Sequence, residues 1–324
     1  MHPKSSDSHF VPKVYLKKFT KRNGKLFQIK KNAKKQSKLW DKHPSEICYQ
    51  KGFYEFSSKH PLAGYIVAEP NYLEERGFLY ENRLNKWIDK VISPTHLMPQ
   101  QEAYDLAATL FNLKIRNPYY REHLFSGMNI STSIDSILAE ERRRWEAGQS
   151  IAQLKSIPLE LVNQITESLR QEWTTDKEIA KELHNRSLLE SLHNPSQIRK
   201  WVYYKLAAAK WVILKTTINH QFICSDNPGY CLDEENKLHN TKLGGPCTFI
   251  FPLTSYHALA IIAQDDGIRA LHDVKPIEHI HATPEVAKLI NYATWLTANK
   301  EVYAAYEQSL LQTQYTVNGS KLII

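Results

Sequence analysis

The stretch of this sequence with the most chemical potential is Ser225-Asp226-Asn227-Pro228, which follows an apolar segment patterned like a short strand. A carboxylate at the end of a strand is held by the sheet and projects into the loops, where ligands usually bind. Asp226 is therefore a candidate general base or metal ligand, and Asn227 is a candidate ligand-binding amide. The alternative is a turn in which the Asp226 carboxylate accepts hydrogen bonds from backbone N–H groups.

Three further polar residues stand among apolar ones. His9 can act as acid, base or ligand because imidazole titrates near neutral pH, or its ring can hold the N-terminal segment in place through a backbone hydrogen bond. Arg116 follows the apolar face of a helix, where it can bind phosphate or carboxylate bidentately or pair internally with an acid such as Glu102. Asn291 falls in a buried helical run, so its amide belongs to a hydrogen-bond network or to a site.

These four polar residues, if they meet at one cavity, supply a base, a carboxylate, an anion clamp and an amide donor. Such a set suits hydrolysis of a phosphoester. The leading hypothesis is a nuclease or related phosphoesterase that acts on nucleic acid or a phosphorylated substrate. Its cofactor would be a divalent metal held by Asp226 and a second carboxylate, either Glu75 or Glu81.

Positive charge is concentrated at the N-terminus, since residues 1–51 carry fourteen Lys/Arg against three Asp/Glu and the remainder carries 28 against 31. Asn23-Gly24 before an alternating segment predicts a β-hairpin there. A basic hairpin attracts nucleic acid, phosphorylated ligands or an acidic protein, and salt should weaken the attraction. The rival hypothesis is therefore a non-enzymatic binding or regulatory module, and a structural protein with a solvated basic face is the third. The candidate contact residues are Lys30, Lys31, Lys34 and Lys35.

Composition narrows the class of protein. A chain of 324 residues with 42% hydrophobic residues can bury a large core without disulfides. The four cysteines have no C-x-x-C spacing, which favours a reducing compartment, the cytoplasm, over a disulfide framework or zinc ribbon. No signal peptide or membrane span is expected, because the N-terminus is polar and lysines interrupt the longest apolar stretch. The sequence also lacks the short motifs of nucleotide-cofactor enzymes, P-loop NTPases, α/β-hydrolases and zincins.

The elements that must position these residues change along the chain. Apolar residues recur every three or four positions from Asn71 onward, which predicts helices for about 150 residues. Pro118 interrupts the strongest of them, 99–125. Asn194-Pro195 predicts the start of a long helix that continues to about Ile218.

Strand patterns dominate after Gln221. Segments 248–253 and 257–263 predict two adjacent strands. Thr283 followed by a proline predicts the N-cap of a helix that runs to about residue 300. The Val-Asn-Gly-Ser stretch near residue 318 predicts a last short strand.

These patterns predict an α+β fold with one mostly antiparallel sheet formed from the N- and C-terminal segments and a large helical middle region. The predicted parts are an extended and hairpin segment, 1–70, that pairs with the C-terminal sheet, a helical region, 71–220, and C-terminal strands with a helix, 221–324. His9 and Asp226 then come from opposite ends of the sequence into one neighbourhood.

Five ordered motifs span most of the chain: His9-x-Val11-Pro12-x-x-Tyr15-Leu16-x-x-Phe19, Arg116-Asn117-Pro118, Ser225-Asp226-Asn227-Pro228, Phe251-Pro252-Leu253 and Asn291. Together they resemble the bacterial family known as domain of unknown function 4238. Members of that family usually have threonine between the arginine and the proline, where this chain has Asn117. The resemblance supports the predicted boundaries, and because the family has no established activity it implies no mechanism.

Overall fold

Two sheets dominate the α+β fold of the protein. The computed structural model describes residues 7–32, 39–56, 71–150, 156–240, 246–265 and 273–319. The larger sheet contains, in spatial order, Ile277–His281 (β13), Ala209–Lys215 (β6), His257–Asp265 (β11), Cys247–Thr254 (β10), Tyr230–Asp233 (β8) and Leu238–His239 (β9). It is antiparallel except for the parallel pair β13 and β6.

The smaller sheet joins the two ends of the chain. Its antiparallel strands are, in order, Trp40–Lys42 (β3), Leu26–Lys30 (β2), Glu301–Ala304 (β14) and Cys224–Ser225 (β7). Two further strand pairs are Asp7–His9 (β1) with Tyr49–Lys51 (β4), and Met98–Pro99 (β5) with Val274–Lys275 (β12). The predicted pairing of N- and C-terminal segments is confirmed, and the strands are divided between two main sheets.

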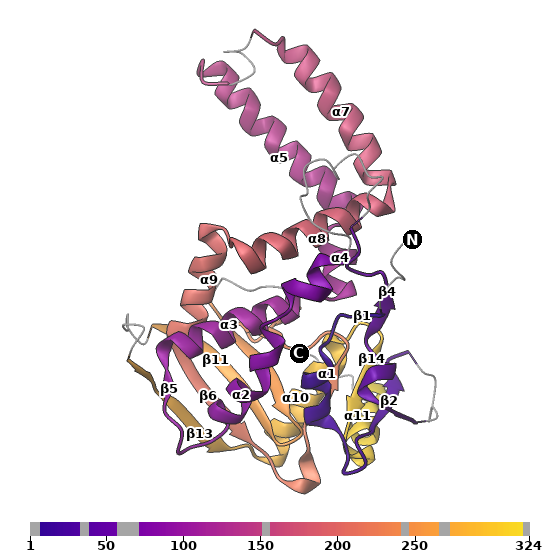
Figure 1. Ribbon diagram of the computed structural model, residues 1–324, viewed down its shortest axis with the longest axis vertical. Helices are drawn as coiled ribbons and strands as arrows, with labels where there is room; N and C mark the ends of the chain where they lie inside the picture. Colours follow the sequence, from indigo (N-terminus) through magenta and orange to yellow (C-terminus); the bar gives the residue numbers. More distant parts are fainter. Residues whose placement is uncertain are drawn as a thin grey trace.

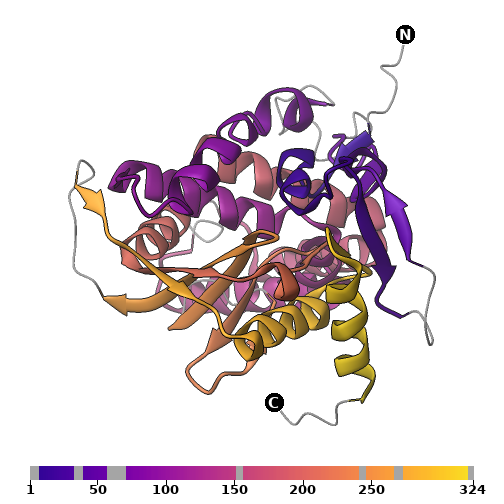
Figure 2. The same cartoon turned by 90° about the horizontal axis from the view of Figure 1, so that it is seen from below.

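Helices cover both faces of the larger sheet (Figure 2). Their bounds are Lys13–Leu16 (α1), Glu81–Val91 (α2), Gln100–Ile115 (α3), Pro118–Leu124 (α4), Gly127–Glu146 (α5), Leu159–Thr175 (α7), Lys177–His193 (α8), Gln197–Ala208 (α9), Pro284–Thr297 (α10) and Glu307–Gly319 (α11). None of the helices in the described ranges is long and apolar enough to cross a bilayer.

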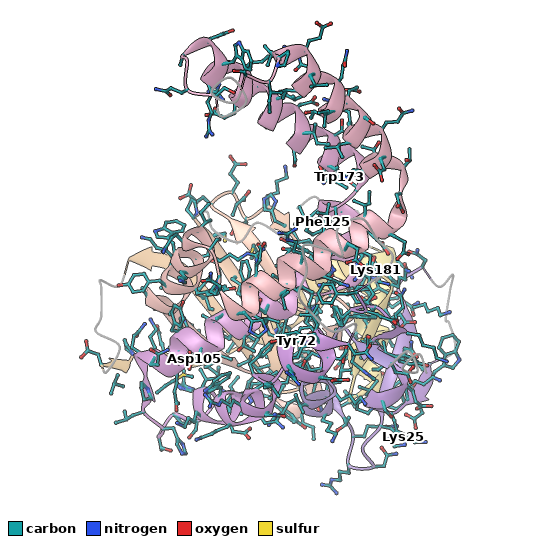
Figure 3. All side chains as sticks on the ribbon, turned by 45° about the horizontal axis from the view of Figure 1, so that its top comes forward. Lys25, Tyr72, Asp105, Phe125, Trp173 and Lys181 are labelled. Carbon is teal, nitrogen blue, oxygen red and sulfur yellow. The ribbon has the colours of Figure 1, made fainter. Side chains whose placement is uncertain are left out.

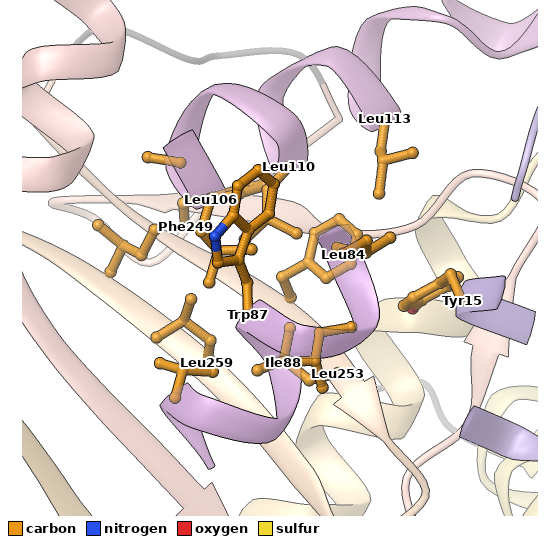
Figure 4. Close-up of a cluster of buried hydrophobic side chains, with 14 of the residues drawn as sticks. Tyr15, Leu84, Trp87, Ile88, Leu106, Leu110, Leu113, Phe249, Leu253 and Leu259 are labelled. Carbon is orange, nitrogen blue, oxygen red and sulfur yellow. The ribbon is translucent and has the colours of Figure 1, made fainter. Parts of the chain in front are cut away.

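The core is divided by the alternation of side chains along the strands. Trp211 and Ile213 of β6 belong to a cluster with α2 and α3, which contribute Trp87 and Leu110 among others (Figure 4). Val212 and its neighbours on the opposite face belong to a second cluster with α10. The sheet is therefore the middle of three layers.

One pair of helices extends away from the sheets. In Figure 1, α5 and α7 form an antiparallel hairpin that projects from the body, and Figure 3 shows side chains such as Trp173 along it. Arg170 of α7 bonds to Asp135 of α5 at 2.5 Å. Since α7 has no buried residue, this hairpin adds little to the core.

Some predicted elements are confirmed by the structure. Pro118 ends the first long helix, with Asn117 as the N-cap of α4, and Thr283 caps α10 by accepting from Val286 N. Strands β10 and β11 pair as expected from their patterns.

Other predicted elements are wrong. The helix α9 begins after its N-cap Ser196 and ends at Ala208, and the segment expected to continue it is β6. Apolar side chains on both faces of 211–214 are typical of a strand inside a covered sheet. The expected last strand near residue 318 is also wrong, because residues up to Gly319 belong to α11.

Candidate functional site

Asp226 directly follows β7, as expected, and its carboxylate binds the start of β14. Oδ1 accepts from Asn299 N at 2.8 Å, and Oδ2 accepts from Lys300 N at 2.7 Å and from Glu301 N at 3.2 Å. Burial raises the pKa of Asp226 to about 7, although these three hydrogen bonds oppose the shift. The carboxylate therefore holds a distant loop, and three of its about four acceptor positions are used.

Asp226 also lines a pocket of about 750 Å³ between the N-terminal strands and the loop before β14, which we call the hairpin pocket. Its walls come from β2, β3, β4 and residues 299–301. The side chains that matter for the argument below are Gln28, Lys30, Trp40, Lys42, Tyr49 and Lys300.

The strand register explains why those of these residues that belong to β2 and β3 share one face of the smaller sheet. Tyr49 belongs to β4, which pairs with β1, and Lys300 precedes β14. Gln28 lies between Trp40 on β3 and Tyr303 on β14, and Lys30 lies opposite Glu301. Neighbours in register point to the same side of a sheet. The alternate residues of β2 and β14 pack in a core cluster on the other side. The pocket thus combines residues from the two ends of the sequence.

The four lysines of the predicted hairpin differ in position. Lys30 is exposed, and its Nζ lies 5.2 Å from the centre of the Trp40 ring. Lys31 instead donates from Nζ to the carbonyls of Leu296 at 2.6 Å and Ala298 at 2.9 Å, at the C-terminal end of α10. Burial lowers the pKa of Lys31 although Asp226 raises it. Lys34 and Lys35 lie outside the described residues.

Arg116 is fully buried, and all of its guanidinium nitrogens have partners inside the protein. Nε donates to Phe10 O at 3.1 Å, Nη2 to His9 O, and Nη1 to the Glu81 carboxylate and to Tyr80 OH. The acid that it pairs with is Glu81; Glu102, the acid suggested by the sequence, pairs with Lys90. Arg116 thereby fixes the N-terminal segment to the helical layer.

His9 meets Arg116 through its backbone, while its ring makes separate contacts. Nδ1 lies 3.2 Å from Asp7 O, and the ring centre lies 5.5 Å from that of Tyr49. Nε2 has no hydrogen-bond partner among the described residues. Burial, with a smaller contribution from Lys13, lowers the pKa of His9.

Asn291 and Asn227 both connect α10 to the segment around β7. Asn291 accepts from Ile223 N at 3.0 Å and donates to Gln221 O at 2.9 Å, as a strand neighbour would. Asn227 donates from Nδ2 to Thr297 O at 2.7 Å. Asn291 lines a different hollow, of about 860 Å³, between α10 and α11. The condition set by the sequence analysis, that the four polar residues meet at one cavity, is not met by Asp226 and Asn291.

Lys114 is a buried polar residue that the sequence analysis missed. Its Nζ donates to Asn227 Oδ1 at 2.7 Å, to Gly229 O at 2.7 Å and to Asn240 Oδ1 at 3.2 Å. Burial lowers its pKa to about 7. The sequence signal for burial of Lys114 was its position four residues after Leu110, which places both residues on the apolar face of the helix.

Several residues of the five motifs contact each other across the fold. These contacts are Arg116 to His9 O, Asn117 Nδ2 to Asn227 Oδ1 at 2.9 Å, and Tyr15 OH to Pro252 O at 2.7 Å. The motifs therefore tie the N-terminal segment, α3 and the strand ends together.

The described residues contain no group of three His, Cys, Asp or Glu side chains arranged to hold a metal ion. Of the two acids considered as partners of Asp226, Glu81 is paired with Arg116 and Glu75 is exposed on the short π-helix Leu73–Gly77.

Comparison with known proteins gives one match. The model of a family described as "Protein of unknown function (DUF4238)" matches residues 8–308. No curated protein and no solved structure matches the chain.

Proposed function

The chain belongs to the DUF4238 family of proteins of unknown function, and we propose that it binds nucleic acid or a phosphorylated ligand in the hairpin pocket without hydrolysing it. The observation that supports this most strongly is that Lys30, Lys42 and Lys300 line one pocket together with two aromatic side chains, Trp40 and Tyr49. Lysines neutralise phosphates and aromatic rings stack on bases.

Five acids, Asp41, Glu46, Glu122, Asp226 and Glu301, line the pocket beside the three lysines. Asp41 is paired with Lys21, the Glu46 carboxylate accepts from the backbone N of His43 at 2.6 Å, and Glu301 accepts from Tyr303 OH at 2.8 Å. Within the described ranges, by contrast, the three pocket lysines form no ion pair. Of the other two acids, Asp226 accepts from three backbone N–H groups and Glu122 is exposed. The three ammonium groups remain for a ligand.

The double substitution Lys30→Glu with Lys42→Glu should weaken binding of a fluorescein-labelled single-stranded 12-mer RNA by at least about tenfold. Loss of two phosphate contacts should also reduce the magnitude of the slope of log affinity against log salt concentration by about 1.4. Fluorescence anisotropy at three salt concentrations measures both. Lys31 is left unchanged because it stabilises the end of α10.

The matched control makes the same charge change at exposed helix positions outside the pocket, Lys86→Glu with Lys200→Glu. Long-range attraction alone would weaken both variants equally. Equal affinity of the pocket variant and the wild-type protein would contradict binding at this pocket.

Hydrolysis of a phosphoester is the second candidate, favoured by the position of Asp226 in the pocket with a pKa of about 7. A carboxylate with such a pKa is suited to act as a general base. The assay is turnover of the same RNA and of bis(p-nitrophenyl) phosphate, with and without Mg²⁺ or Mn²⁺. Turnover that Asp226→Asn and His9→Ala abolish without lowering thermal stability would replace the binding proposal by this one.

A further inference from the structure

One polar side chain in the hairpin pocket lacks a partner. Gln28 is 5% exposed, and its Oε1 is buried without a hydrogen-bond partner among the described residues. A buried acceptor without a donor costs free energy, so such groups normally bond to water or to a ligand. Gln28 is also one of the residues that line the hairpin pocket.

The neighbours of Gln28 are of the kind that hold a planar ring. Trp40 is its partner in register on β3, and Tyr49, which is 41% exposed, lines the same pocket from β4. The ammonium of Lys30 lies beside the Trp40 ring. This combination matches the three parts of a nucleotide: aromatic side chains for the base face, the buried amide of Gln28 for the base edge, and lysines for the phosphate.

We propose that the hairpin pocket accepts one unpaired nucleobase, with an N–H group of the base edge donating to Gln28 and the phosphate near Lys30 and Lys42. This inference rests on the proposed function and narrows it to nucleotides whose base is unpaired. A duplex presents its base edges already paired and its faces already stacked, so it reaches the lysines but not the amide. A free nucleotide and a single strand share the required chemistry.

The experiment compares four probes by competition for the labelled single-stranded 12-mer: that strand unlabelled, its duplex, a mixture of nucleoside 5′-monophosphates, and ribose 5-phosphate. We expect the strand to bind at least about tenfold more tightly than the duplex, and ribose 5-phosphate to compete much more weakly than the monophosphates. Competition by monophosphates as strong as by the strand identifies free nucleotides as the ligand, and competition by the strand alone identifies nucleic acid.

Gln28→Leu removes the acceptor at nearly constant volume, and it should fold because it also removes an unpartnered buried polar group. It should weaken binding of the strand about tenfold and leave the duplex unchanged. The control Gln101→Leu alters a glutamine of α3 that bonds to Asp105 outside the pocket, and it should bind as the wild type does.

Four outcomes would overturn the inference. Equal affinity for strand and duplex, or wild-type affinity of Gln28→Leu for the strand, would exclude base insertion while binding through Lys30 and Lys42 stands. Competition by ribose 5-phosphate as strong as that by the monophosphates would also exclude base insertion. A wild-type protein that binds none of the four probes would remove the proposed function together with this inference.

Discussion

Replacing Arg116 with alanine should lower the free energy of unfolding by about 3–5 kcal/mol, the usual loss when one partner of a buried ion pair is removed. The substitution leaves Glu81 without its partner, and it leaves the carbonyls of His9 and Phe10 without a donor. It also removes the guanidinium that lies 4.0 Å from the centre of the Phe78 ring. Urea unfolding followed by tryptophan fluorescence measures the loss.

The matched control is Arg143→Ala on α5, where the guanidinium is 73% exposed and bonds to Glu140 at 2.7 Å. An exposed pair of this kind contributes less than about 1 kcal/mol. Arg116→Lys keeps the charge but loses the planar fork, so its stability should lie between those of the wild type and Arg116→Ala. If Arg116→Ala were as stable as the control, the anchoring role would be contradicted.

Acid should destabilise the protein through His184, which is buried between α4 and α8. Its Nε2 donates to Ile115 O at 2.8 Å, and its Nδ1 accepts from Arg121 Nε at 3.0 Å. Burial, and next the charge of Arg121, lower its pKa from 6.5 to about 3. Between these values the unfolded chain binds a proton that the folded protein does not, so stability is complete above pH 6.5 and falls toward pH 3.

At about 1.4 kcal/mol per pKa unit, His184 should lower the free energy of unfolding by an amount on the order of 4–5 kcal/mol between pH 6.5 and pH 3. Of this loss, about 3 kcal/mol should be reached by pH 4. His184→Gln keeps an acceptor and a donor but does not titrate, so its stability should fall less between pH 7 and pH 4. Urea unfolding at pH 7 and pH 4 measures the loss of stability for each protein. Subtracting the loss of His184→Gln from that of the wild type removes the contribution of the other titrating groups. His96→Gln, at an exposed position, should follow the wild type. Parallel curves for wild type and His184→Gln would refute this assignment.

Local signals were sufficient where the structure is determined locally. Thr283-Pro284 predicts a helix start because a side-chain acceptor before a proline can cap the first turn, whereas at Asn194-Pro195 the cap is Ser196. The β6 segment was misread because an apolar run of its length has no distinct period when both faces are buried. Its strand character depends on β11 and β13, which come later in the chain.

The same distinction applies to the pocket. Sequence reasoning selected Asp226 and Lys30 by residue type, and both line the hairpin pocket. It did not single out Gln28, whose position matters only once β2 pairs with β14. It named Glu102 as an example of an acid that Arg116 could pair with, whereas the partner is Glu81, which only the packing of the helices selects. Residue types are readable from sequence, whereas the partner that occupies each side chain is a property of the fold.

The pairing of β2 with β14 has a consequence for synthesis in the cell. Leu26–Lys30 leaves the ribosome about 270 residues before Glu301–Ala304, the strand that pairs with it. At about 5–20 residues per second, β2 waits roughly 15–60 seconds for its partner. During that time the side chain of Ile29, which is fully buried in the folded protein, lacks the β14 residues of its core cluster. A nascent chain stalled before Glu301 should therefore be a chaperone client, and the hairpin pocket should form only after Glu301–Ala304 has been translated.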